Sequence, residues 1–518
     1  MKIERTKNAG RNMAFGIILK IYQIVLPFIM RTALIYFMGV QYLGLSSLFA
    51  SVLQVLNLAE LGVGSAMVYS MYKPIVEDDK KTICALMRLY RTYYRWIGIV
   101  IGVVGLALLP MIPNLVKGDI PSELNIYILY LLNLGTTVFS YWLFAYKNSL
   151  LNAFQRVDVI SNVTMITSTI LYILQFCVLC FVKDYYAYLI VALVVQILKN
   201  ILTAIVVTRM YPDYKPVGKL SKSEIKIING RIRDLFTAKV CTVIVGSADT
   251  IVVSAFLGLT VLAIYQNYYY IITSIIGFIT VIYDACFAGI GNSLVAESKE
   301  KNYNDFNKMT FIIMWIVGFC CTSLLCLYQP FMKVWVGEDL MFSMNVVVCL
   351  CIYFFVREID HLLSIYKDAA GLWHNDRFRP LVTALANLGM NVLMVQYIGI
   401  FGIILSTVLS YIIIGLPWLI RNIFTNMFEP KLLKPYLRKM MLYSIVVLIS
   451  CALTYYVCGL INLSDWGTLI LRLFICTIMP NLIFCVAYHN QKFLRESAEL
   501  LERMLKGKIP VRKILHIK

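Results

Sequence analysis

Long apolar stretches joined by short polar connections dominate the chain. Several uninterrupted apolar runs are longer than the roughly 18 residues that indicate a membrane-spanning helix. A transmembrane β-barrel would instead show shorter segments in which apolar and polar residues alternate. The pattern therefore predicts an all-α polytopic membrane protein with about fourteen transmembrane helices. We place these spans at residues 13–38, 45–70, 94–116, 125–147, 159–182, 186–208, 235–257, 264–290, 308–328, 343–368, 381–397, 400–420, 439–459 and 467–488.

The longest polar connection, about residues 209–234, separates two groups of six predicted spans. A weak internal similarity supports two lobes, because Arg31–Gly39 parallels Asp249–Gly258 with one residue inserted. Each of these segments lies at the expected outer end of the first span of its group. Internal repeats around a mid-membrane site are common in secondary transporters. We expect an N-terminal lobe over 1–218, a C-terminal lobe over 219–430, and two further spans with a basic tail over 431–518.

The charge of the chain follows its predicted topology. Only 14% of the residues are charged, whereas soluble domains hold about 25%. Of the 47 Lys and Arg residues, 39 fall in the N-terminal tail, in alternate connections and in the C-terminal tail, while the opposite loops hold three. Because basic residues accumulate on the cytoplasmic side, we expect both termini in the cytoplasm and a multi-pass protein in the plasma (inner) membrane. The net charge of +19 then requires no nucleic-acid partner.

The N-terminal segment has a charged start followed by apolar residues, as a signal peptide does. Its apolar part continues to Met38, and no cleavage site with small residues is evident. We therefore expect it to remain as the first span.

The predicted span over 343–368 carries charged residues near its middle. The face opposite these charged residues is apolar and is expected to contact lipid. A charge at mid-membrane costs about 2.5–3.5 kcal/mol on the insertion scale, so these residues need partners or water. Either Arg357 forms a structural ion pair with Asp360 or Glu358, or the polar face lines a wet cavity. Residues three and four apart share one face of a helix, and the polar face comprises Tyr353, Arg357, Asp360, His361, Ser364 and Asp368. The apolar face comprises Ile352, Phe355, Val356, Ile359 and Leu363.

Other spans carry similar polar positions. The first span places two cations on one face and contains Pro27, which removes a backbone donor. An alternative for Arg31 is a side chain that extends to the outer surface. Cations and amides would bind an anionic polar substrate, and acids would exchange coupling ions. The candidate substrate-binding residues are Lys20, Gln23, Arg31, Asn57 and Arg357. The candidate ion-coupling residues are Glu60, Asp249, Asp284, Asp360 and His361.

The sequence contains no enzyme signature that we recognise. It has no P-loop, no H-E-x-x-H and no G-x-S-x-G. Its connections are too short for a catalytic domain of ordinary size. Most of its 14 cysteines lie inside apolar runs and are interpreted as small buried side chains. We therefore expect a protein that is not an enzyme and that needs no cofactor or metal.

Several segments resemble the Wzx-type polysaccharide flippases, which belong to a superfamily that also holds multidrug MATE exporters and the lipid II flippase. The resemblance covers most of the chain. The segments that carry it are Leu58–Ala66 (LAELGVGSA), Tyr72–Pro74, Glu77–Lys81, Asp249–Val253, Gly258, Tyr265, Ala370–Pro380, Asn387, Asn391 and Gly399–Gly402.

This resemblance implies a two-lobed transporter that moves undecaprenyl-diphosphate-linked oligosaccharide to the outer leaflet by alternating access. It also implies that cavity cations, here Lys20, Arg31 and Arg357, hold the diphosphate. The lipid bilayer and the lipid-linked oligosaccharide are the expected partners, and other polysaccharide-assembly proteins are candidates.

Two alternatives stay open at this point. A cation-coupled multidrug exporter of the same fold would use Glu60, Asp249 or Asp360 as its ion site. A membrane glycosyltransferase or polymerase is the alternative of another class, although the short outer loops argue against a polymerase.

Overall fold

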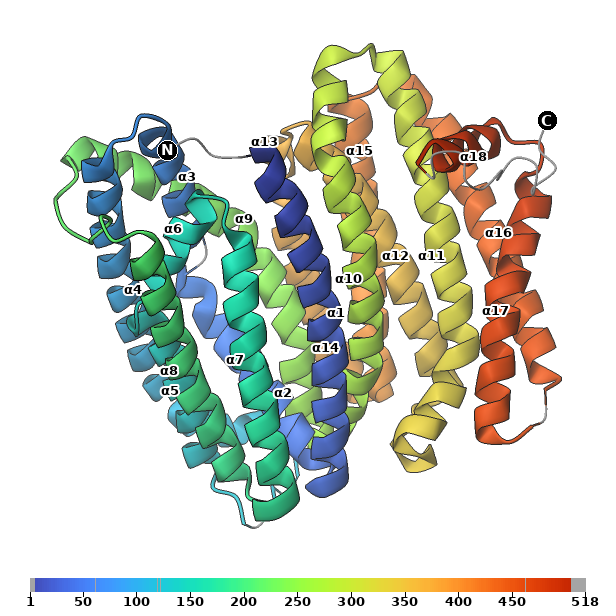
Figure 1. Ribbon diagram of the computed structural model, residues 1–518. Helices are drawn as coiled ribbons and strands as arrows, with labels where there is room; N and C mark the ends of the chain where they lie inside the picture. The colour runs from blue at the N-terminus through green and yellow to red at the C-terminus, as the bar shows by residue number, and fades with distance from the viewer. Residues whose placement is uncertain (1–4, 61, 119, 122, 462, 505–518) are drawn as a thin grey trace. The chain divides into compact units, whose positions relative to one another are not determined.

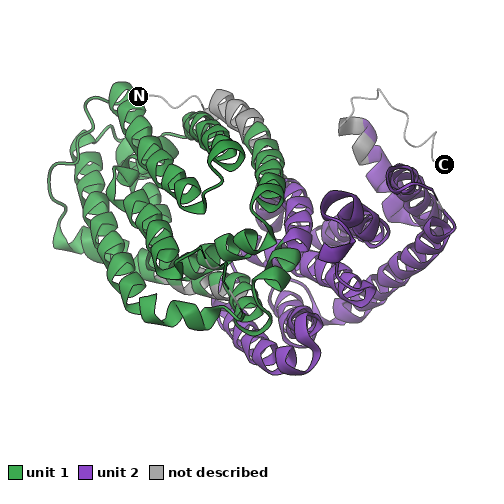
Figure 2. Cartoon of the chain, turned by 90° about the horizontal axis from the view of Figure 1, so that it is seen from below, with its two compact units in different colours: residues 1–266 green, residues 267–518 purple. Residues whose placement is uncertain are grey.

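The computed structural model describes residues 5–60, 62–118, 120–121, 123–461 and 463–504. These residues form helices and connecting turns without any strand, which confirms the predicted all-α class (Figure 1). The chain divides into two compact units, residues 1–266 and 267–518 (Figure 2). The boundary that we place at residue 218 concerns transport lobes and stays a prediction.

Unit 1 is a bundle in which each long helix packs against its neighbours. α1 contacts α2 and α7, α5 lies between α4 and α8, and α9 packs along α2. Tyr22 of α1 hydrogen-bonds the hydroxyl of Thr169 of α7 at 2.7 Å. The helices are α1 (Arg5–Phe37), α2 (Val40–Leu56), α3 (Val63–Val76), α4 (Lys80–Leu108), α5 (Ile126–Trp142), α6 (Asn148–Ala153), α7 (Val157–Cys177), α8 (Tyr185–Met210) and α9 (Lys222–Leu257).

Unit 2 is organised around α11, which packs against α12, α16 and α17. α12 in turn contacts α14 and α15. α10 begins in unit 1 and continues into unit 2. The helices are α10 (Leu259–Ala296), α11 (Lys299–Val336), α12 (Met344–Ala369), α13 (Trp373–Asp376), α14 (Arg379–Ser410), α15 (Leu416–Asn426), α16 (Leu433–Gly459), α17 (Asp465–Tyr488) and α18 (Lys492–Met504).

Within the described residues, ten helices are long and apolar enough to cross a membrane, or eleven if the bent pair Ile126–Trp142 and Ala145–Ala153 is one span. Our prediction of fourteen differs in three places. The stretch over 235–257 counts only as the shorter apolar helix Gly246–Leu257, and α12 is not among these helices, in keeping with its charged residues. The predicted spans over 381–420 fall within the single segment Trp373–Asn426.

That last segment turns back on itself where the sequence predicts a break. Ile398 and Gly399 have non-helical backbone angles, and Gly399 has a φ of 56°. The two halves of α14 then run side by side, since the Asn387 amide donates to the Thr407 hydroxyl at 2.9 Å and Ser406 hydrogen-bonds Asn391. α14 is therefore a helical hairpin, as expected for two successive spans.

The internal similarity between Arg31–Gly39 and Asp249–Gly258 has a structural counterpart. Gly39 joins α1 to α2 with φ 110° and ψ 163°, and Gly258 joins α9 to α10 with φ 89° and ψ 176°. Side chains strongly disfavour this region of backbone space, which is essentially restricted to glycine. Both repeats thus end in the same glycine junction.

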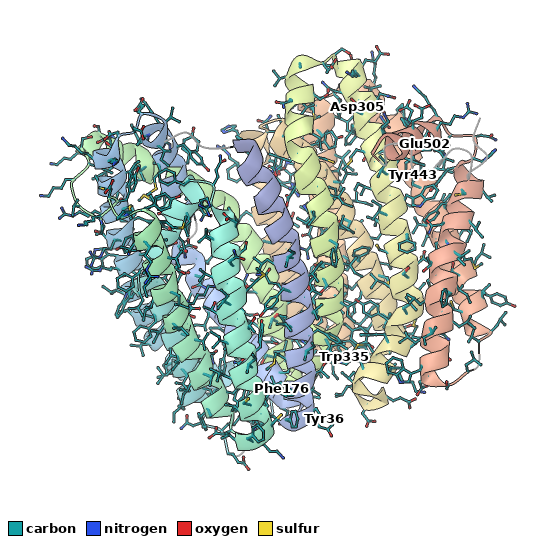
Figure 3. The ribbon with its side chains drawn as sticks, in the orientation of Figure 1. Tyr36, Phe176, Asp305, Trp335, Tyr443 and Glu502 are labelled. Carbon is teal, nitrogen blue, oxygen red and sulfur yellow. The ribbon has the colours of Figure 1, made fainter. Side chains whose placement is uncertain are left out.

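Aromatic and charged side chains mark the ends of each unit separately (Figure 3). In unit 1, Tyr36 and Phe176 lie at one end of the bundle with 82% and 44% of their surface exposed. In unit 2, Trp335 lies toward one end of α11 and Asp305 toward the other. Tyr and Trp are enriched at the membrane–water interface, so these positions fit a multi-pass membrane protein.

Candidate functional site

The second predicted span is broken in its middle. α2 ends at Leu56, residues Asn57–Glu60 form a 3-10 turn, and α3 starts after Gly62, whose φ is 88°. The whole stretch Val40–Val76 is nevertheless long and apolar enough to span a membrane. Irregular backbone at membrane depth is tolerated where it is buried in protein or lines a wet cavity. In transporters such breaks form substrate and ion sites.

A cavity of about 690 Å³ lies beside this break, entirely inside unit 1. Residues of α3, α4, α5 and α6 line it together with Glu60 at the end of the 3-10 turn, and the cavity is open on one side. Five of its lining residues are tyrosines and two are asparagines, so hydroxyls, amides and aromatic faces dominate the wall. These residues are Tyr69, Tyr72, Tyr90, Tyr94, Tyr141, Asn148 and Asn152, beside Glu60.

Glu60 is held at the cavity wall by a chain of hydroxyl groups. The Tyr94 hydroxyl donates to Glu60 Oε1 at 2.9 Å, and the Tyr90 hydroxyl donates to that of Tyr94 at 2.5 Å. Gly64 makes room for this chain, because a Cβ there would lie 3.0 Å from the Tyr90 hydroxyl and 3.2 Å from Glu60 Oε1. The carboxylate is therefore fixed in place and still borders the cavity.

This wall can bind two kinds of ligand. Hydroxyl, amide and carboxylate groups suit a sugar, which offers many hydroxyls, and a tyrosine face packs on the apolar face of a sugar ring. Tyrosine faces around one carboxylate also suit an organic cation. The geometry alone is compatible with either chemistry.

A cation that the sequence pattern places only in a basic linker contacts one of the tyrosines that line the cavity. The Arg231 guanidinium of α9 lies 4.8 Å from the centre of the Tyr69 ring and donates to the Ser70 hydroxyl at 3.2 Å. Tyr69 itself is 60% exposed. No sequence pattern distinguishes Arg231 from its basic neighbours, since its position depends on how α9 packs against α3.

Of the predicted site residues in unit 1, Glu60 lines this cavity and the others do not. Asn57 begins the 3-10 turn that breaks the span, and its Oδ1 is buried without a hydrogen-bond partner. Lys20 and Arg31 are partly exposed on α1, and Gln23 is exposed. Asp249 of α9 is partly buried. Asp284, on the part of α10 that belongs to unit 2, is exposed.

The charged residues of α12 form ion pairs with partners other than those we named. Asp360 pairs with Arg379 at 3.0 Å, and Arg379 also binds Asp376 at 2.8 Å. Lys367 binds Asp376 at 3.5 Å, and the Asn422 amide donates to the same carboxylate at 3.0 Å. This network joins the end of α12 to α13, α14 and α15, so an Arg357–Asp360 pair is the wrong assignment.

Arg357 instead lies among tyrosines. Its Nη1 donates to the Tyr353 hydroxyl at 2.8 Å and to the Tyr269 hydroxyl of α10 at 3.3 Å. Within the described residues its guanidinium has no carboxylate partner within 4.0 Å. It thus keeps its positive charge uncompensated by a direct ion pair, as a site for an anion would require.

Glu358 was not among the predicted site residues, but its environment is unusual. Its side chain is completely buried, and neither carboxylate oxygen has a hydrogen-bond partner. The Tyr283 hydroxyl donates at 3.2 Å to the backbone carbonyl of Glu358, and the His361 ring packs on Tyr283 with centres 4.4 Å apart. Tyr283 therefore contacts both the backbone of Glu358 and the ring of His361.

The apolar face of α12 is largely buried within unit 2. Val356, Ile359 and Leu363 are 6%, 8% and 0% exposed. Of the five residues on that face only Ile352 is extensively exposed, at 42%. The expectation that this face contacts lipid is wrong for Val356, Ile359 and Leu363, because α11 and α14 pack against α12.

The apolar helices, one of them broken beside a polar cavity, together define a multi-pass helical membrane protein. No protein-family model matches the sequence, and no curated protein is similar to it in sequence.

Solved structures of a flippase and of multidrug transporters have a similar fold. The chain is similar to the lipid II flippase MurJ in an inward closed conformation, with a TM-score of 0.66 and 16% identity, over 92% of this chain and 99% of that one. It also resembles an inward-facing multidrug resistance MATE transporter, with a TM-score of 0.59 and 15% identity, over 78% and 97%. A Vibrio cholerae MATE transporter matches with a TM-score of 0.53 and 13% identity, over 80% and 97%. These proteins are transporters and flippases, and the likeness concerns the fold.

Proposed function

We propose that the protein is a flippase that moves undecaprenyl-diphosphate-linked oligosaccharide across the plasma membrane by alternating access, for surface polysaccharide biosynthesis. The observation that supports this most is the cavity at the broken span, whose wall offers tyrosine, asparagine and Glu60 side chains. A sugar head group cannot cross hydrocarbon unaided, and these groups would replace its water. The lipid tail would stay in the bilayer.

In this proposal the diphosphate binds to cations near the head group. Lys20, Arg31 and Arg357 are the candidates from the sequence, and Arg231 is added by its contact with Tyr69 of the cavity wall. The protein forms no new covalent bond in this process. Glu60 becomes the preferred ion-coupling residue, because it borders the cavity, whereas Asp360 is tied to Arg379.

The same wall favours a second function, the export of organic cations coupled to an ion gradient. Five tyrosines around Glu60 could hold a cation through their ring faces and its carboxylate. The two proposals differ in the charge of the substrate, and one experiment can separate them.

The test uses the full chain reconstituted into vesicles that contain lipid-linked oligosaccharide on the inner leaflet. A flippase makes the sugar accessible to a glycosidase added outside, and mass spectrometry then finds the oligosaccharide otherwise unchanged. Tyr72→Ala, in the cavity wall, should slow this movement, whereas Tyr36→Ala, at an exposed position, should not. Uptake of a fluorescent organic cation without any movement of sugar would contradict the flippase and support the exporter. Elongated sugar chains would support the enzyme alternative.

A further inference from the structure

Three cysteines from three different helices converge inside unit 2. Cys326 lies on α11, Cys458 near the end of α16, and Cys476 on α17. Their sulfur atoms all lie within 4.8 Å of one another. Each side chain is at most 1% exposed. Leu327 and Ile475 pack against the cluster, so its surroundings are apolar.

Helix packing brings these residues together. α11 contacts both α16 and α17, and these two helices also contact each other. α16 and α17 lie beside α11 along much of their length (Figure 1). Because one cysteine is far from the other two in sequence, the spacing matches no known metal-binding motif. The cluster therefore escapes any analysis of the sequence alone.

A positively charged side chain lies near the three thiols. Arg472 lies one helical turn before Cys476 on α17, and its Nη1 donates to the Cys326 carbonyl oxygen at 3.4 Å. The Nε of the same guanidinium is buried without a hydrogen-bond partner. A buried donor of a charged group usually has a hydrogen-bond partner, because a buried donor without one costs free energy. An anionic group next to Arg472 would satisfy this requirement.

We propose that Cys326, Cys458 and Cys476 form a binding site for Cu(I) that joins α16 and α17 to α11. Thiolates are soft ligands that select Cu(I), Zn²⁺ or iron–sulfur clusters. Structural Zn²⁺ sites take four ligands, whereas the described residues offer three sulfurs here. Cu(I) accepts two or three sulfur ligands and brings a single positive charge.

The chemistry of binding is balanced without any redox step. Each thiol that coordinates the metal releases its proton to solvent, and copper stays in the +1 state. The resulting thiolates carry more negative charge than Cu(I) neutralises. The Arg472 guanidinium lies beside Cys326 and offsets part of the remainder.

The experiment measures Cu(I) uptake by the purified full chain, under anaerobic reducing conditions and in competition with a chromophoric Cu(I) chelator. The wild type should withdraw Cu(I) from the chelator, and its melting temperature should rise, because a ligand that binds only the folded state stabilises it. The triple variant Cys326→Ala, Cys458→Ala and Cys476→Ala should lose both effects. A matched triple variant removes three thiols elsewhere, Cys84→Ala, Cys349→Ala and Cys485→Ala, and should keep them.

A second measurement does not depend on whether the first triple variant folds. X-ray absorption by copper bound to the wild type should show sulfur neighbours alone, at about 2.3 Å as in other metal–thiolate sites. A shell of nitrogen or oxygen neighbours would overturn the proposal. So would equal uptake by the wild type and the first triple variant, which would leave the cysteines as small apolar side chains.

Discussion

Asp360 forms its ion pair with Arg379, at 3.0 Å, and not with Arg357 on its own helix. Asp360 therefore belongs to a network that fixes the turn between α12 and α14. Arg357, one turn away, remains among the hydroxyls of Tyr353 and Tyr269. Two charges that the sequence places on the same helical face thus have different environments, one structural and one available to an anion.

The Arg379 network should be essential for folding. Arg379→Ala leaves the Asp360 carboxylate without its cation and leaves the buried Asp376 with the Lys367 cation alone, and removing one partner of a buried pair costs about 3–5 kcal/mol. We expect a large loss of folded protein, measured by thermal unfolding of the purified chain in detergent. Arg377→Ala, at an exposed neighbouring position, is the control and should unfold as the wild type does. Equal unfolding of the two variants would show that the network contributes little.

The hydrogen bonds that hold Glu60 at the cavity wall should depend on Gly64. Gly64→Val adds a Cβ 3.0 Å from the Tyr90 hydroxyl and 3.2 Å from Glu60 Oε1, and its branched side chain crowds the same space, so we expect it to displace the hydroxyl chain to Glu60. We expect transport to fall about tenfold, the equivalent of ~1.4 kcal/mol, with the chain still inserted. Glu60→Gln keeps the shape of the side chain and tests its charge. Gly102→Val is the control, since a Cβ there would meet only a Val138 methyl at 3.7 Å.

The two glycine junctions should respond differently to the same substitution. Gly39→Ala and Gly258→Ala both force alanine into a backbone region that costs of order 1–3 kcal/mol. At Gly39 nothing lies within 4 Å of the added Cβ, whereas at Gly258 the Lys117 carbonyl oxygen lies at 2.8 Å. Gly258→Ala should therefore lower the melting temperature more. The opposite order would indicate that the contact between Gly258 and Lys117 relaxes easily.

Removing the charge of Glu358 should stabilise the protein. Its carboxylate is buried without a hydrogen bond, and such an unsatisfied group costs about 1–3 kcal/mol or more when charged. Glu358→Met fills the same space with an apolar side chain, and we expect a higher melting temperature. Glu338→Met, at a position with an exposed side chain, controls for the loss of one acid. If Glu358→Met is less stable than the wild type, the carboxylate has a favourable role in the fold.

The predicted topology can be tested with two exposed positions. Lys219→Cys, in the basic linker, should react with a membrane-impermeant thiol reagent only after the cell is opened. Glu338→Cys, in the turn after α11, should react in intact cells. Both variants are made in a chain without other reactive cysteines. Labelling of position 219 in intact cells would contradict a cytoplasmic linker.

The sequence predicts the elements of this fold that depend on local residue order. Two successive spans were predicted over 381–397 and 400–420, and the structure has the break between them at Ile398 and Gly399. The same holds for Gly39 and Gly258, whose shared junction was visible as a weak repeat.

Features that depend on contacts between helices were missed. The partner of Asp360 lies beyond the turn that contains α13, and nothing in the pattern of α12 favours it over Arg357. The cysteine cluster and the position of Arg231 likewise arise from packing. Glu60 was predicted as an ion site, but the tyrosines around it come from α3, α4 and α5, and no periodicity connects α4 and α5 to the turn that holds Glu60.

The hairpin of α14 has one further consequence. Its two halves are joined by buried amides and hydroxyls, with Asn387, Asn391, Ser406 and Thr407 each at most 2% exposed. If one half slid past the other by a single turn, these groups would lose their partners away from water, at a cost of about 1–3 kcal/mol for each. The hairpin must therefore move as a rigid body. Any bending is expected beyond it, at the π-helical segment Tyr411–Gly415, where the regular helical hydrogen bonding changes.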